Sequence, residues 1–148
     1  MFAEFERAGK QVKPGREQIL AQVTEVTPLA RPRDDYKAYL AEIAVPPNLA
    51  RWCTLPGSFV LLRPESAREA FNVPISVMDT AGRGIRIAVE CRGPKTTALE
   101  KALLKDGKVT VTGPFWSGLQ GCTHPADLAH GNTLVVAKGM AQAAVPPI

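Results

Sequence analysis

The stretch Ile85-Arg86-Ile87-Ala88-Val89-Glu90 shows the clearest alternation of residue types in the chain. In an extended strand, Ile85, Ile87 and Val89 fall on one face, and the residues between them fall on the other. Gly82 and Gly84 precede the stretch and mark a turn. The pattern predicts a β-strand with one face buried in a core.

Further segments on both sides of this strand have strand length and end at turn residues. They cover residues 19–26, 36–45, 58–63, 75–78, 108–112 and 133–137. Thr97 and Glu100 predict a capping box for a single short helix, which Gly107 ends. Six or seven strands with one helix favour a small antiparallel barrel or sandwich.

The composition agrees with a small globular domain. The chain has 148 residues and a net charge of +4, and its 13 prolines and 12 glycines suit short strands joined by turns. A content of 45% hydrophobic and 22% charged residues excludes a disordered, collagen-like or coiled-coil chain. The length fits one domain, or one domain with part of a second.

The sequence predicts a cytoplasmic protein with no membrane segment. No apolar run approaches the roughly 20 residues of a membrane-spanning helix, and the first residues lack the pattern of a secretory signal. Three cysteines, Cys53, Cys91 and Cys122, lie far apart, so we expect free thiols.

Neither a metal site nor nucleic-acid binding is predicted. Cys122, His124 and His130 lie near one another, but a tetrahedral site needs four ligands, and the other cysteines lie in separate segments. With 6% aromatic residues and interspersed charges, the chain offers no stacking platform or basic stripe.

The C-terminal part has a different pattern. Residues 134–141 form an apolar run that passes through Gly139 into alanine-rich sequence, as at the start of a nucleotide-binding β-α unit. No second strand or crossover helix follows. We expect either the beginning of a second domain or a tail added to the barrel.

Five motifs together resemble a known family. They are Pro56-Gly57-Ser58-Phe59-Val60-Leu61-Leu62-Arg63, Pro74-Ile75-Ser76-Val77, Gly93-Pro94-Lys95-Thr96-Thr97-Ala98-Leu99, Gly107-Lys108-Val109 and Gly113-Pro114-Phe115-Trp116-Ser117-Gly118. In this order the chain resembles the FAD-binding barrel domain of the ferredoxin reductase-like superfamily. Within it, the resemblance is closest to the electron-transfer subunit of dihydroorotate dehydrogenase and to sulfide dehydrogenase.

The resemblance implies a six-stranded antiparallel Greek-key barrel that holds FAD. Residues 1–18 would be a tail, 19–118 the barrel, and 119–148 a linker with the first strand and turn of a truncated NAD(P)-binding-like domain. The protein would be one component of an oxidoreductase that passes electrons between NAD(P)H, flavin and an iron–sulfur or catalytic partner subunit. NAD(P) binding by this chain alone is not expected, and a homodimer stays open.

The flavin-side motif of the family is Arg-Pro-Leu/Ile-Ser, and here it reads Val73-Pro74-Ile75-Ser76. The resemblance assigns these four residues to the cofactor site. Ser76 keeps a hydroxyl that can donate and accept hydrogen bonds to the flavin ring. Val73 cannot pair with a phosphate as the family's arginine does.

The family's pyrophosphate motif, Gly-x-Gly-Thr-x-x-Leu, begins a helix whose amides and partial positive charge face the phosphates. Here Lys95 replaces its second glycine, and Thr96 and Thr97 follow. Arg92 and Lys95 would supply positive charge. The resemblance adds a third contact strip, Ala88-Val89-Glu90, and implies no catalytic residue.

A second reading remains open. Val73 and Lys95 depart from the family pattern, and these departures favour a barrel that has lost its cofactor and serves as a protein-interaction or assembly module. The order of the motifs favours the flavin domain.

Overall fold

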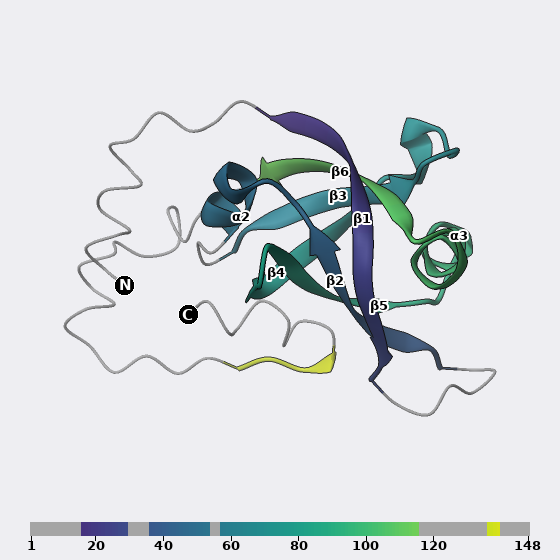
Figure 1. Cartoon of the computed structure of the whole chain (residues 1–148). Helices are drawn as coiled ribbons and strands as arrows, with labels where there is room; N and C mark the ends of the chain where they lie inside the picture. The colour runs from purple at the N-terminus through teal and green to yellow at the C-terminus, as the bar shows by residue number, and fades with distance from the viewer. Residues whose placement is uncertain (1–15, 30–35, 54–56, 116–135, 140–148) are drawn as a thin grey trace.

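The computed structural model describes residues 16–29, 36–53, 57–115 and 136–139. Six strands make up most of it (Figure 1): β1 (Glu17–Pro28), β2 (Ala38–Ala44), β3 (Phe59–Pro64), β4 (Val73–Ala81), β5 (Gly84–Glu90) and β6 (Lys108–Phe115). Between them lie helices α2 (Pro47–Cys53) and α3 (Pro94–Lys101), a 3-10 turn at Glu69–Phe71, and a π-turn at Ala102–Asp106 that continues α3.

The strands form a closed barrel in the order β1-β2-β5-β4-β3-β6, and all neighbours are antiparallel. Strands β3, β4 and β5 are consecutive neighbours, and β2 and β6 flank them on the two sides. A fourth strand beside three consecutive ones is the Greek-key arrangement. The predicted six-stranded antiparallel barrel is therefore confirmed.

The core fills the barrel as the alternation predicts. Ile85, Ile87 and Val89 of β5 have no exposed surface, and Arg86 between them lies on the outer face. The other strands contribute Ile43, Val60, Leu62, Val77, Val109 and Val111 to the same cluster. Burying each such side chain contributes about 1.5–3 kcal/mol to stability.

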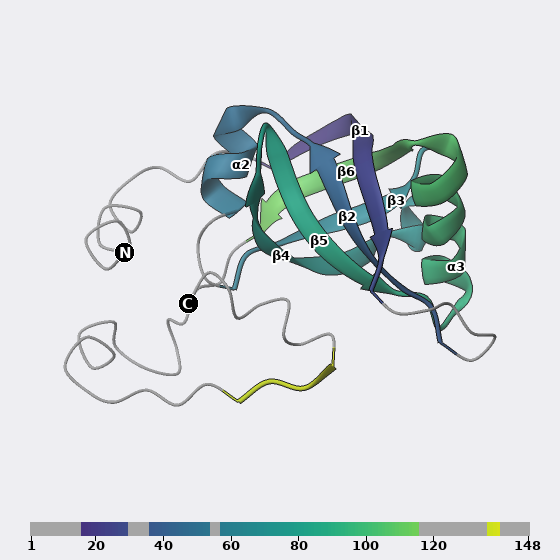
Figure 2. The same ribbon diagram turned by 60° about the horizontal axis from the view of Figure 1, so that its bottom comes forward.

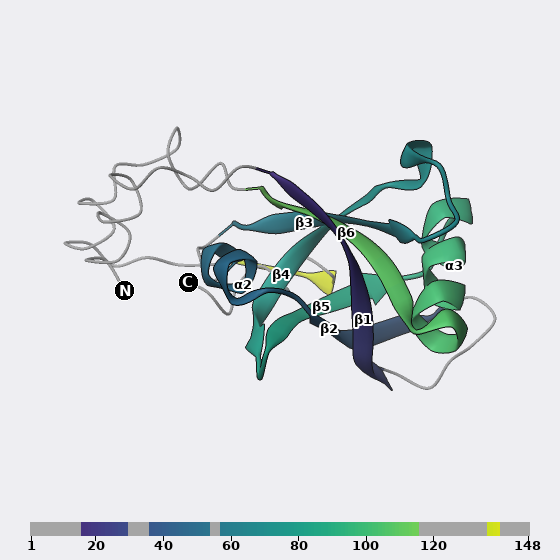
Figure 3. The same ribbon diagram turned by 45° about the horizontal axis from the view of Figure 1, so that its top comes forward.

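Helices α2 and α3 lie at opposite ends of the barrel (Figure 2). Leu49 and Cys53 of α2 enter the core at one end, and Leu99 of α3 and Leu103 of the π-turn enter it at the other. Figure 3, in which the top of the view of Figure 1 is turned forward, shows the same separation. Each helix covers an end of the barrel core that the strands alone would leave exposed to water.

The prediction of a single helix was wrong. Helix α2 begins at Pro47, where the sequence pattern indicated only the end of a strand. Proline at a first helical position loses no hydrogen bond, because that amide has no partner within a helix. The two prolines therefore end β2 and also start α2.

The predicted capping box at Thr97 and Glu100 was also wrong. The N-cap of helix α3 lies four residues earlier, at Gly93, with Pro94 in the first turn. The side chain that caps the turn is Thr96, and Glu100 instead accepts a hydrogen bond from Tyr39. A tertiary contact has taken the carboxylate that the local pattern assigned to the cap.

Most of the C-terminal predictions lie outside the described residues, including residues 133–135, Trp116, and the cluster of Cys122, His124 and His130. Residues 136–139 are described and are not in a strand. Across the described part of the chain, no helix is long and apolar enough to cross a membrane. The same residues contain no group of three or more His, Cys, Asp or Glu that is arranged to hold a metal ion.

Candidate functional site

The predicted cofactor residues on β4 and β5 lie where these two strands stop pairing with each other. The β4–β5 pairs run from Ala81 and Gly84 to Val77 and Ile87, with a register shift near Val77. Beyond that limit, Val73–Ser76 pairs with β3, and Ala88–Glu90 pairs with β2. The facing edges of the two segments therefore carry no ladder between them.

Along β4, side chains alternate between the interior and the outer surface. Val73 and Ile75 pack against the core cluster, so Val73 stands at a position that favours an apolar residue. Pro74 and Ser76 lie on the opposite, outer face. Ser76 is half-buried and makes no side-chain hydrogen bond within the described residues, so its hydroxyl is available to a ligand there.

Helix α3 follows β5 directly, and its first turn is ordered by one side chain. The hydroxyl of Thr96 accepts hydrogen bonds from the backbone amides of Arg92 and Gly93, at 3.0 and 3.1 Å, and donates to the Gly93 carbonyl. Thr97 donates its amide to that same carbonyl. Thr96 is thus engaged in holding the turn, whereas the sequence assigned it to the ligand.

Two amides of this turn remain without a partner in the described residues, those of Lys95 and Thr96. The first amides of any helix lack an intrahelical acceptor, and they carry the positive end of its dipole. An added Cβ at Gly93 would meet no atom within 4 Å. The space beside the turn is therefore open to an anionic group.

The two predicted cations differ in their engagement. Arg92 donates through Nε to Glu90 at 2.6 Å, so the charges of these two predicted site residues compensate each other. Lys95 is exposed and has no ion pair in the described part of the chain. Lys95 is consequently the cation that is available at the start of α3.

The sequence did not identify Arg63 as a site residue. It follows Leu62, which is the register partner of Val73, and its Nη1 donates to the Ala67 carbonyl at 2.6 Å. Its buried Nε and the buried Oδ1 of Asn72 have no hydrogen-bond partner in the described structure. A cation thus follows the register partner of Val73 on the neighbouring strand, a relation that only strand pairing reveals.

An aromatic pair lies beside Ser76 and was also missed. Phe59 is the register partner of both Ser76 and Phe115, and its ring stacks on that of Phe115 with centroids 5.1 Å apart. The guanidinium of Arg16 lies 4.8 Å from the Phe115 ring centre. These residues form an apolar, cation-capped outer surface next to the Ser76 hydroxyl.

Tyr39 anchors α3 to the barrel. Its hydroxyl donates to Oε1 of Glu100 at 2.7 Å, and Lys37 lies 3.8 Å from the same carboxylate. The hydrogen bond to Glu100, together with burial, raises the pKa of Tyr39 to about 12. Burial and the Glu100 charge raise the pKa of the nearby Cys91 thiol to about 11, so this cysteine is not poised as a nucleophile.

These features fit a flavin dinucleotide in chemistry. Unpartnered amides and Lys95 suit the diphosphate, and the open edges of β4 and β5 with Ser76 suit the polar rim of a flavin ring. The aromatic surface at Phe59 suits an apolar ring system. The residues present therefore fit such a group, although Val73 itself contributes only packing.

The fold is that of the ferredoxin reductase-like barrel. Ferredoxin-NADP+ reductase from Plasmodium falciparum superposes with a TM-score of 0.52 at 16% identity, over 70% of this chain and 40% of that one. The same reductase with 2'P-AMP gives a TM-score of 0.63 at 15% identity, over 88% of this chain and 51% of that one. The chain thus spans about half or less of these structures.

No protein-family model matches the chain, and no curated protein matches it in sequence. The likeness therefore concerns the fold.

Proposed function

We propose that the chain is the FAD-binding domain of an electron-transfer oxidoreductase subunit, related to that of dihydroorotate dehydrogenase. One observation carries the proposal. The residues of the flavin-side motif, the contact strip and the pyrophosphate motif, which are separate in sequence, lie around the end of the barrel where the β4–β5 ladder opens and α3 begins. The barrel that carries them has the ferredoxin reductase-like fold, which supports the proposal.

Each group has a distinct task in binding. The amides of Lys95 and Thr96 and the ammonium of Lys95 would hold the diphosphate, and Arg63 would add charge beside Val73. Ser76 would orient the ring by hydrogen bonding, and the open strand edges would offer backbone donors and acceptors. When bound, the flavin would supply the redox chemistry, while the barrel fixes its position.

The other parts of the electron path lie beyond the barrel. NAD(P)H would be the donor or product through a nicotinamide-binding domain, and an iron–sulfur or catalytic partner subunit would exchange electrons with the flavin. We propose a cytoplasmic location.

Titration with FAD, followed by flavin fluorescence and the visible spectrum, tests the proposal. Lys95→Ala should weaken the affinity for FAD several-fold, with a smaller effect at high salt. It should leave the affinity for riboflavin unchanged, because riboflavin has no phosphate. Lys105→Ala is the matched control, since Lys105 is exposed near the far end of the same helical segment. Ser76→Ala should weaken both ligands about fivefold, the worth of one hydrogen bond of about 1 kcal/mol.

A protein that retains no bound flavin after incubation with excess FAD would refute the flavin function. It would instead support the second candidate, a barrel that acts as a protein-interaction or assembly module. The ion pair between Arg92 and Glu90 favours this candidate, because the Arg92 guanidinium is then already paired and less available to bind a phosphate.

A further inference from the structure

Strand β1 has one edge that is paired only along its second half. Its pairs with β2 begin at Val23 and Ile43, whereas its pairs with β6 extend back to Glu17. Strand β2 ends at Ala44, and Pro46 and Pro47 follow. Proline has no amide hydrogen to donate, so β2 cannot continue as a partner of β1 beyond this point.

The direction of the unpaired backbone groups follows from one hydrogen bond. Val23 donates its amide to the Gly107 carbonyl at 2.8 Å, which places the backbone groups of Val23 on the β6 side. Because these groups alternate along a strand, those of Leu20 and Gln22 point to the opposite side. Neither amide has a backbone partner there in the described structure.

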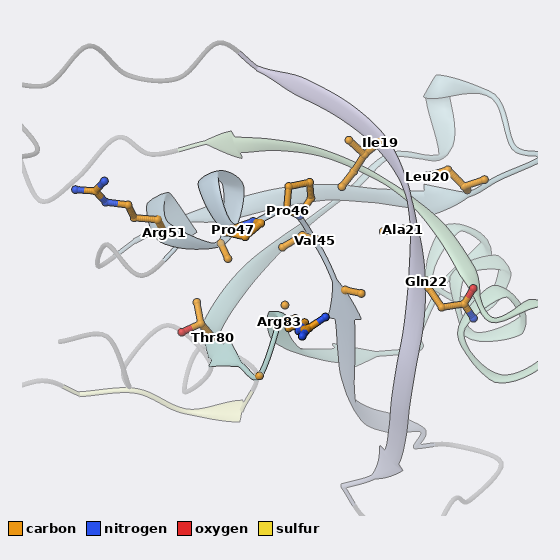
Figure 4. A pocket seen from close by; sticks show the side chains of 14 residues that line it. Ile19, Leu20, Ala21, Gln22, Val45, Pro46, Pro47, Arg51, Thr80 and Arg83 are labelled. Carbon is orange, nitrogen blue, oxygen red and sulfur yellow. The ribbon is translucent and has the colours of Figure 1, made fainter.

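This edge faces a cavity of about 900 Å³ at the α2 end of the barrel. Figure 4 shows the lining side chains. They come from β1, the end of β2, α2 and the β4–β5 turn, and they include Leu20, Gln22, Val45 and Arg83. Most of these side chains are apolar, and Leu20 keeps 51% of its surface exposed.

The charged side chains that line the cavity are all basic. Its lining contains two arginines and no aspartate or glutamate. Arg83 makes no ion pair in the described residues, and Figure 4 shows its side chain among the lining residues of β2 and the turn. Gly82, with φ of +53°, makes the tight turn that places Arg83 there.

We propose that this groove binds an extended peptide segment of a partner protein, which adds a strand to the free edge of β1 and places a carboxylate beside Arg83. An unpaired strand edge gives affinity through main-chain hydrogen bonds, and neighbouring pockets select the side chains. The apolar walls select apolar side chains at alternate positions. A second copy of this chain is disfavoured, because pairing two such grooves would bring their arginines together.

The groove is separate from the proposed flavin site. None of the predicted cofactor residues on β4, β5 and α3 is among its lining residues, most of which belong to β1, the end of β2, α2 and the β4–β5 turn. The inference therefore does not depend on flavin binding, and either proposal can fail alone.

The probe is a terminally blocked five-residue peptide of alternating valine and glutamate, since about 17 Å of extended chain covers the free edge. In amide NMR spectra of the full chain, it should shift Leu20, Gln22 and Val45. A peptide of alternating valine and lysine should bind at least tenfold more weakly, and methylation of the glutamate peptide's backbone amides should abolish binding.

Charge reversal gives the matched test. Arg83→Glu should reverse the preference, so that the lysine peptide binds better than the glutamate peptide. Arg68→Glu, the same change at an exposed residue outside the cavity lining, should leave the preference unchanged. The amide spectrum shows whether Arg83→Glu is folded. If it is unfolded, Arg83→Gln takes its place, and this variant should bind the glutamate and lysine peptides equally.

Three results would overturn the proposal. One is a dissociation constant for the glutamate peptide weaker than about 1 mM. Another is an equal response to both peptides in the unmodified chain. The third is strong protection of the Leu20 and Gln22 amides from hydrogen exchange in the free protein, because the edge would then already be filled.

Discussion

The hydrogen bond from Tyr39 to Glu100 joins residues 61 positions apart and ties α3 to β2, so its removal tests the barrel end next to the proposed flavin site. Tyr39→Phe keeps the buried ring and deletes only the hydroxyl, which donates at 2.7 Å to a carboxylate whose side chain is 13% exposed. Hydrogen bonds to charged groups contribute about 1.5–3 kcal/mol, and the lower value suits a pair near the surface. We expect a loss of about 1.5 kcal/mol at pH 7.

The assay is urea unfolding followed by tryptophan fluorescence and circular dichroism. With a slope of about 1–3 kcal/mol per molar urea, this loss lowers the midpoint by about 0.5–1.5 M. A double-mutant cycle with Glu100→Gln should recover most of the energy as coupling. The equivalent cycle with Lys37→Ala should give less than about 0.5 kcal/mol, because that ion pair is longer and more exposed.

The pH dependence has a definite sign. The pKa of Tyr39 is about 12 in the folded chain, above its ordinary value of 10.0, so the folded state holds this proton more tightly than the unfolded state. The contribution is therefore fully present below pH 10 and is lost as the pH rises towards 12. The stability difference between the unmodified chain and Tyr39→Phe should shrink over that interval. Equal stability of the two proteins at pH 7, or a difference that grows above pH 10, would refute the reasoning.

Other predictions concern backbone contact and thiol reactivity. Gly84→Ala should destabilise the barrel by about 3 kcal/mol or more or prevent folding, because its Cβ would lie 2.0 Å from the Ile43 carbonyl oxygen. Gly93→Ala meets no atom and should cost no more than about 1 kcal/mol of N-cap preference, as thermal unfolding of both variants would show. Cys53, whose pKa burial raises to about 12, and Cys91, at about 11, should resist iodoacetamide at pH 8 until urea unfolds the chain; peptide mapping of rapid labelling at either cysteine would contradict this.

The strands could be predicted because each carries its own signal. The alternation in residues 85–90 depends only on which side chains face the core, and the structure buries Ile85, Ile87 and Val89 as expected. Six of the seven predicted strands matched observed strands in place, although β4 is longer, from Val73 to Ala81, and the predicted strand at 133–137 has no observed counterpart in its described residues, 136 and 137. Local periodicity and turn residues were sufficient for this level of structure.

The starts of the helices were harder to predict, because proline is found both at the end of a strand and at the beginning of a helix. Pro46 and Pro47 stop a strand and also begin a helix, and the sequence does not show which side of the pair matters. At α3, two capping patterns competed. Glu100 was removed from the local one by Tyr39, whose proximity depends on the barrel being closed.

The candidate site divides in the same way. The order of the motifs predicted Ser76, Lys95 and the start of α3 as candidate site residues, because these are local features of the sequence. Arg63 and the Phe59–Phe115 stack were missed because their relevance arises only from strand pairing, between positions far apart in sequence. A register prediction for β3 against β4 and β6 would have been the signal needed to find them.

The barrel is closed in its strand order, yet several neighbouring strands pair over only part of their length, and two of the resulting openings bear on binding. The β4–β5 ladder stops at Val77 and Ile87, and the β1–β2 ladder stops at Val23 and Ile43. The first leaves an opening beside the start of α3, and the second leaves an edge that faces the groove beside α2. Unpaired edges promote aggregation unless a ligand, a partner or a covering segment satisfies them. We propose a dinucleotide for the first opening and an extended acidic peptide for the second, and since no predicted cofactor residue lines the groove, the two proposals can be tested separately.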